Sequence, residues 1–109
     1  MIYLGSPYTH PNDAIRVQRY HAACDAAARL MRAGHVVISP IAHSHSIAMR
    51  NDLPTKWEWW QRQCIALLER CDALYVLRLD GWRASDGLDA EIDRACIRGM
   101  PVRFIDPSA

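Results

Sequence analysis

The chain has 109 residues, of which half are hydrophobic and 23% are charged, a balance typical of one folded domain. Its formal net charge of +1 argues against a nucleic-acid polymer or an anionic membrane as the main partner, because neither would be attracted strongly. No apolar run approaches the roughly 20 residues of a membrane span, and no secretory signal opens the chain, so we expect a single cytoplasmic domain over residues 1–109.

The first half of the chain predicts a strand, a long helix, a second strand and a loop. Residues 1–4 form a short apolar run. From about residue 12 to residue 33, apolar side chains recur at the spacing of one helix face. Residues 35–39 are rich in β-branched side chains and predict a strand. Residues 40–53 show no clear period and predict a long loop, with or without a helical turn, an uncommon feature that is often functional.

The second half repeats this alternation. A helical pattern returns over residues 54–70, and residues 73–77 form the third apolar strand. A polar loop over residues 80–84 leads into a helix over residues 85–98. The run 101–105 closes the chain as a fourth strand.

Strands that alternate with helices predict right-handed βαβ units and a parallel sheet. We therefore expect a three-layer, flavodoxin- or Rossmann-like α/β fold with a four-stranded, or five-stranded, sheet and helices on both faces. In such sheets ligands bind beyond the carboxyl ends of the strands, near the point where the strand order reverses. This rule selects the segments 5–10, 40–48 and 79–87, and the end near Asp106.

The first of these segments, Gly5-Ser6-Pro7-Tyr8-Thr9-His10, follows a strand and opens a helix. Gly5 permits close approach of the backbone, while the Ser6 hydroxyl and the helix N-terminus are suited to an anion. The alternative is a plain turn that contains a proline. The segment is not a P-loop or a dinucleotide fingerprint, because the glycine spacing and the lysine are absent.

The segment Ser85-Asp86-Gly87-Leu88-Asp89-Ala90-Glu91 enters the last predicted helix. Ser85 can cap that helix, whose free N–H groups can bind phosphate. Glu91 lies beside the inward face, and the positive helix end favours its ionised form. Such a carboxylate can attack a sugar carbon or stabilise an oxocarbenium-like centre. The alternative is that Glu91 and Asp89 only complement the helix dipole.

Other polar residues near the predicted cleft are weaker candidates. Asp72 begins the third strand at its amino end, which favours a structural role, whereas Asp80 at the carboxyl end is better placed for a ligand. His43 and His45 are expected to contact a ligand or to stabilise their loop. A metal site would need a third ligand that the loop does not supply, so we expect no metal, and a metal-dependent hydrolase built on these two histidines is a minor alternative.

Four tryptophans are a heavy aromatic load for so short a chain. Trp57 and Trp60 share the inward helix face and are expected to pack in the core. Trp59 points elsewhere and is a candidate for a subunit interface. Because the helical faces and tryptophans exceed what one small core needs, we expect a homo-oligomer, a dimer or a tetramer. Trp82 lies on a predicted cleft loop, where a flat base can stack on its ring.

Four segments together resemble a known family. They are Ile2-Tyr3-Leu4-Gly5-Ser6-Pro7-Tyr8, Ser39-Pro40-Ile41-Ala42-His43-Ser44-His45, Cys71-Asp72-Ala73-Leu74 and Ser85-x-Gly87-x-x-x-Glu91. The chain resembles the DUF1937 family within the nucleoside 2-deoxyribosyltransferase-like superfamily. The resemblance covers nearly the whole chain.

The resemblance implies cleavage of an N-glycosidic bond without a cofactor, with Glu91 as nucleophile and with transfer of the sugar to another base or to water. Tyr8 would orient Glu91 or the sugar, and Asp72 would match a carboxylate near the pocket, in conflict with its position on the strand. Ser85 stands where classical transferases carry an aspartate and where nucleotide-hydrolysing relatives use serine for phosphate. With Ser6, this favours a 5′-phosphorylated substrate.

Two expectations complete this interpretation. The chain ends soon after the fourth strand and is expected to lack the segment that, in larger relatives, completes a neighbouring subunit's site. The main alternative to an enzyme is therefore a module that binds or senses a nucleotide without turning it over. Either way, the expected ligand is a nucleoside or nucleotide.

Overall fold

Strands and helices alternate along the structure, a computed structural model that describes residues 1–108. The elements in chain order are β1 (Ile2–Gly5), α1 (Asp13–Arg32), β2 (Val37–Ile38), α2 (Pro40–Asn51), α3 (Trp57–Leu68), β3 (Ala73–Leu77), the 3₁₀ turn η1 (Trp82–Ala84), α4 (Asp86–Ile97) and β4 (Val102–Ile105). None of these helices is both long and apolar enough to cross a membrane.

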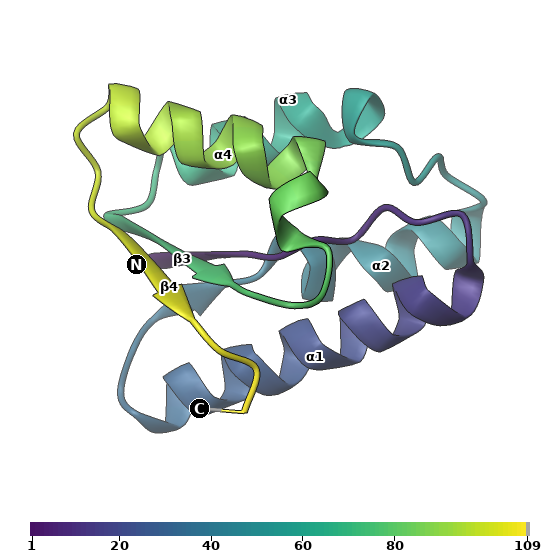
Figure 1. Ribbon diagram of the computed structural model, residues 1–109, viewed down its shortest axis with the longest axis horizontal. Coiled ribbons are helices and arrows are strands. Elements are labelled where there is room, and N and C mark those ends of the chain that lie inside the picture. The colour runs from purple at the N-terminus through teal and green to yellow at the C-terminus, as the bar shows by residue number, and fades with distance from the viewer. Residues whose placement is uncertain (109) are drawn as a thin grey trace.

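The four strands form one parallel sheet in the order β2-β1-β3-β4. β1 lies at its centre, where Tyr3 pairs with Ile38 of β2 on one side and with Leu74 of β3 on the other. Helices α3 and α4 cover one face of the sheet, and α1 and α2 lie on the other (Figure 1). The three-layer α/β fold is therefore confirmed, and the strand order reverses between β1 and β3.

The alternation of side chains along β1 divides the core between the two faces of the sheet. Tyr3 faces α3 and α4, where it belongs to a buried cluster with Leu74 and Leu88. Leu4 faces the opposite side and packs with Ala26 of α1 and Leu77 of β3. The small side chains of α1 let that helix lie close to the sheet.

The predicted loop over residues 40–53 is wrong, because most of it forms α2. The Ser39 hydroxyl accepts a hydrogen bond from the Ala42 amide and caps the helix, and Pro40 occupies its first turn, where proline is tolerated. The buried positions Pro40, Ser44 and Ala48 do follow a four-residue helical spacing. They are small or polar, so no apolar stripe reveals the helix in the sequence.

Candidate active site

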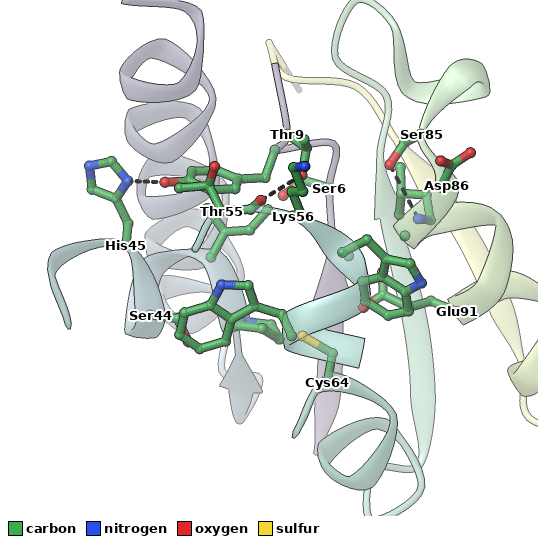
Figure 2. A pocket seen from close by; sticks show the side chains of 18 of the residues that line it. Ser6, Thr9, Ser44, His45, Thr55, Lys56, Cys64, Ser85, Asp86 and Glu91 are labelled. Carbon is green, nitrogen blue, oxygen red and sulfur yellow. Dashed lines mark hydrogen bonds between the residues drawn. The ribbon is translucent and has the colours of Figure 1, made fainter. Parts of the chain in front are cut away.

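A cavity of about 470 Å³ lies at the carboxyl ends of β1 and β3 (Figure 2). The loop after β1 and the first turns of α4 line it near the sheet. The first half of α2 and residues 55–58 supply other walls. This is the point where the strand order reverses, as expected for a ligand site in a parallel sheet.

The cavity brings together some of the predicted site residues and leaves others out. Those that line it come from three of the predicted segments: Gly5, Ser6, Tyr8, His45, Ser85, Gly87 and Glu91. Five others are not part of its lining: Pro7, His43, Asp72, Asp80 and Trp82. The loop after β1 and the start of α4 are therefore the segments in which sequence reasoning placed the site best.

Glu91 is a buried carboxyl group on the wall of the cavity, with only 6% of its surface exposed. Burial raises the pKa of Glu91 to about 7, because a charged carboxylate loses its hydration there. The expectation that the helix end keeps Glu91 ionised overlooks this cost. The helix dipole acts mainly within the first turn of α4, and Glu91 lies beyond that turn. At neutral pH the group is therefore divided between its acidic and ionised forms.

Tyr3 is the partner of Glu91 that sequence reasoning missed. Its hydroxyl donates a hydrogen bond to Oε2 of Glu91, and this bond lowers the pKa of the carboxyl against the larger effect of burial. The ring is fully buried on the α4 side of the sheet. A tyrosine in a buried strand predicts a polar partner in the interior, because its hydroxyl needs a hydrogen bond there.

Tyr8 therefore does not hold Glu91 through its hydroxyl, which contacts His45 instead. The Tyr8 hydroxyl lies 2.6 Å from Nδ1 of His45, and the His45 ring stacks on Tyr20 with 4.2 Å between the ring centroids. Burial, helped by His21 and Arg16, lowers the pKa of His45. His45 is thus neutral at pH 7 and can accept the Tyr8 hydrogen bond.

Gly5 provides the space in which the Glu91 carboxyl group lies. A Cβ atom at this position would lie 3.0 Å from Cδ2 of Leu88 and 3.3 Å from Oε1 of Glu91. The Gly5→Ala substitution is expected to reduce the free energy of unfolding by about 1–3 kcal/mol, because the Leu88 and Glu91 side chains must shift to make room for the added methyl group. Urea unfolding measures this change, and an unaltered midpoint would show that Leu88 moves aside without cost.

Trp57 forms another wall of the cavity by packing over the start of α4. A Cβ atom at Gly87 would lie 3.0 Å from Cε3 of the Trp57 ring, so this glycine allows the contact. Trp57 and Trp60 pack against the core cluster and also line the cavity, whereas Trp59 is exposed. Trp82, expected in the cleft, packs against Phe104 of β4 instead.

The remaining predicted residues lie elsewhere. Asp72 forms an ion pair with the amino group of Met1, and its side chain is 86% exposed at the amino end of β3. The position of Asp72 on the strand thus correctly predicts a place away from the cavity, whereas the resemblance places it near the pocket. Asp80 is exposed, with its carbonyl oxygen bound by Arg19, and Pro7 is buried.

His43 is exposed, and its Nδ1 lies 3.2 Å from the Ser44 hydroxyl. Within residues 1–108 no group of three or more His, Cys, Asp or Glu side chains is arranged to hold a metal ion. His43 and His45 therefore have no third protein ligand in this part of the chain. Burial also raises the pKa of Cys64 in the cavity to about 11, so its thiol is a poor nucleophile at neutral pH.

Ser6 and Ser85 differ in what their hydroxyl groups do. The Ser85 hydroxyl caps α4 by accepting a hydrogen bond of 3.2 Å from the Leu88 amide. The Ser6 side chain is only 7% exposed, and its hydroxyl has no hydrogen-bond partner within the described residues. A buried hydroxyl without a partner costs about 1–3 kcal/mol, so Ser6 is an unsatisfied polar group at the cavity wall.

Ser6→Ala is accordingly expected to stabilise the ligand-free protein by about 1 kcal/mol, because it removes a buried polar atom that lacks a partner. Thermal unfolding without ligand measures this gain. Ser39→Ala is the matched control and should destabilise, since that buried hydroxyl caps α2. A loss of stability in Ser6→Ala would mean that its hydroxyl is already satisfied.

The sequence matches the family model described as "Domain of unknown function (DUF1937)" over residues 1–106. The chain belongs to the DUF1937 family. No curated protein matches the sequence. The matched region of this DUF1937 domain contains every residue that lines the cavity.

The cavity of this DUF1937 domain combines three chemical features. Glu91 is a carboxyl group that changes its protonation state near neutral pH, and Tyr3 holds one of its oxygens. The orphan Ser6 hydroxyl and the N-terminus of α4, where unpaired backbone amides attract anions, belong to residues that line the same cavity. Aromatic rings on two walls suit a flat apolar group. This combination fits a ligand that carries a flat ring and an anionic group.

Proposed function

We propose that this DUF1937 domain cleaves the N-glycosidic bond of a nucleoside or a nucleoside 5′-monophosphate, as enzymes of the nucleoside 2-deoxyribosyltransferase-like superfamily do. The observation that carries the proposal is the buried Glu91 carboxyl group on the cavity wall, held at Oε2 by Tyr3. A carboxylate fixed in this way is suited to attack an anomeric carbon and to form a glycosyl ester.

In the proposed reaction, ionised Glu91 attacks C1′ of the sugar through Oε1 while Tyr3 keeps Oε2 in place. The electron pair of the C1′–N bond leaves with the base, which takes a proton from solvent or from a neighbouring acid. Water, or a second base, then attacks C1′ of the glycosyl ester and releases Glu91 as a carboxylate. A pKa of about 7 lets a substantial fraction of Glu91 be ionised at neutral pH.

The direction of attack fixes where the base would lie. A displacement at C1′ requires the nucleophile and the leaving base on opposite faces of the sugar, so the base points away from Glu91. Figure 2 shows His45 on the far side of the cavity from Glu91. The α2 wall, with His45 and the Tyr8 ring against it, is thus the proposed surface for the base.

The phosphate of a monophosphate would occupy the region between Ser6 and the start of α4. Ser6 offers its unpartnered hydroxyl, and the first amides of α4 have no acceptor within their helix. Ser85 contributes indirectly, because its cap fixes the helix end whose amides face the ligand. This arrangement favours the monophosphate over the unphosphorylated nucleoside.

The test is to incubate the protein with a panel of ribo- and deoxyribonucleosides and their 5′-monophosphates and to follow free base by chromatography. We expect base release from at least one member. Thermal stabilisation by a nucleotide without base release from any member would contradict the enzyme and favour a nucleotide-binding module. Addition of a second base distinguishes hydrolysis from transfer, since only transfer yields a new nucleoside.

A further inference from the structure

Lys56 is the one lysine in the 109-residue sequence, and its side chain lines the cavity. The lining contains no arginine, so Lys56 is its one permanently cationic side chain within the described residues. Lys56 is exposed and forms no ion pair with residues 1–108. Its charge is therefore free for a ligand.

The local structure gives no reason for a lysine at this position. Lys56 is the N-cap residue of α3, and its side chain makes no capping hydrogen bond. Serine, threonine, aspartate and asparagine are favoured there because they accept from the helix amides. A cation at the positive end of a helix is also unfavourable. Lys56 thus weakens the start of α3 slightly, which points to a role outside the helix.

A hydrogen bond ties the segment that carries Lys56 to the loop that carries Ser6. The Thr9 hydroxyl donates to the carbonyl oxygen of Thr55, the residue before Lys56, at 2.9 Å. Thr9 lies three residues after Ser6, so this bond ties the loop after β1 to the segment that carries Lys56. The Lys56, Thr9 and Ser6 side chains overlap in the view of Figure 2, and all three residues line the same cavity.

The other charged side chains of the lining are all acidic, so Lys56 determines whether the cavity can attract an anion. Glu58, Asp86 and Glu91 also line the cavity, and the first two are exposed carboxylates. Without Lys56 every formal charge at the cavity would be negative, and an anion would meet only repulsion from side chains. An anionic ligand therefore depends on this one ammonium group in addition to the Ser6 hydroxyl and the α4 amides.

We infer that Lys56 is the specificity residue that selects a 5′-phosphorylated ligand, by pairing with its phosphate. This inference rests on the proposed function and deepens it. It assigns the choice between nucleotide and nucleoside to a side chain outside the four segments that carry the family resemblance. Lys56 takes no part in bond cleavage, so it acts on binding of the phosphate.

The first test measures binding in the Glu91→Gln background, where turnover cannot interfere. Calorimetry with a nucleoside 5′-monophosphate and with the matching nucleoside should show that Lys56→Gln weakens nucleotide binding by about 10- to 100-fold, since one charge-assisted hydrogen bond is lost. Nucleoside binding should stay within about two-fold, a change of about 0.4 kcal/mol. Lys56→Arg should retain part of the preference.

Two further substitutions control for charge alone. Asp86→Asn removes a carboxylate from the lining and should strengthen nucleotide binding, a change opposite in sign to that of Lys56→Gln. Arg62→Gln removes an exposed cation from α3 outside this cavity and should leave both affinities unchanged. An equal loss of nucleotide binding in Arg62→Gln and Lys56→Gln would overturn the inference, because it would reflect net charge.

The second test uses the fact that the chain has one lysine. Reductive methylation followed by peptide mass spectrometry reports on Lys56 and on the amino group of Met1, which pairs with Asp72 outside the cavity. We expect a 5′-monophosphate to protect Lys56 and not Met1, and the matching nucleoside to protect neither. Equal protection of Lys56 by both ligands, or by neither, would overturn the inference. Protection by the nucleotide without base release would reject the glycosidase and keep the Lys56 site.

Discussion

Glu91→Gln is expected to reduce the rate of base release by roughly 10²–10⁴-fold or more, because an amide can neither ionise nor attack C1′. The substitution keeps the shape of the side chain and can still accept the Tyr3 hydrogen bond. Nucleotide affinity should therefore change little, and single-turnover kinetics would assign the loss to chemistry. Full activity in Glu91→Gln would reject Glu91 as nucleophile.

The same substitution should change stability in a pH-dependent way. The pKa of Glu91 is raised to about 7 in the folded protein, so its stabilising contribution is fully present below its ordinary pKa near 4.5 and is lost as pH rises through 7. Above pH 8 the wild-type protein should have lost about 3 kcal/mol relative to acidic pH, whereas Glu91→Gln should not lose it. Urea unfolding at pH 4 and pH 8 measures the difference.

Asp93→Asn is the matched control for both effects. Asp93 is an exposed carboxylate on the same helix and is not part of the cavity lining. Its substitution should leave base release unchanged and add no pH dependence near neutral pH. A free energy of unfolding of the wild-type protein that does not change between pH 4 and pH 8 would contradict the burial of a neutral Glu91.

Tyr3→Phe is expected to lower base release at pH 7 by about 10-fold, with recovery toward the wild-type rate near pH 9. The Tyr3 hydrogen bond lowers the pKa of Glu91, so its loss raises that pKa and leaves less ionised nucleophile at neutral pH. The measurement is kcat/KM as a function of pH, in which the acidic limb should move to higher pH. The phenylalanine ring keeps the packing of the core.

Tyr8→Phe distinguishes this effect from a general disturbance of the cavity. The Tyr8 hydroxyl contacts His45 and not Glu91, so its removal should leave the acidic limb where it is. An unmoved limb in Tyr3→Phe, or an equal movement in both variants, would reject Tyr3 as the group that positions Glu91 and adjusts its pKa.

The order and type of most elements could be predicted from the sequence because their apolar periods are strong. The runs that became β1 and β3 are nearly all apolar, as strands covered on both faces are, and they were found within a residue or two. Helix α2 could not be predicted, because Ser44 and Ala48 are the small and polar side chains that it buries. Ser39 and Pro40 are the residues that cap and open this helix, but Ser39 also ends the β-branched run 35–39 and therefore belongs to the predicted strand.

The candidate site was predicted in part by the geometry of parallel sheets. The carboxyl ends of parallel strands meet at one edge of the sheet, and this rule predicts a site that contains Gly5, Ser6, Ser85 and Glu91. Tyr3 was missed because it was treated only as an apolar residue of a strand. Trp57 was assigned to the core although it also lines the cavity. These contacts depend on how α3 and α4 pack on the sheet, and local sequence patterns do not predict that packing.

The measurement that tests the central claim most directly is detection of a glycosyl ester on Glu91. A nucleoside 5′-monophosphate with fluorine at C2′ should react slowly, because fluorine destabilises the oxocarbenium-like transition states of both steps. Released base and the intact mass of the protein are followed together, and peptide mapping locates the adduct. We predict one equivalent of base and one fluorosugar phosphate on Glu91, with neither in Glu91→Gln. Base release from the unmodified substrate with an adduct on another residue would contradict Glu91 as the nucleophile.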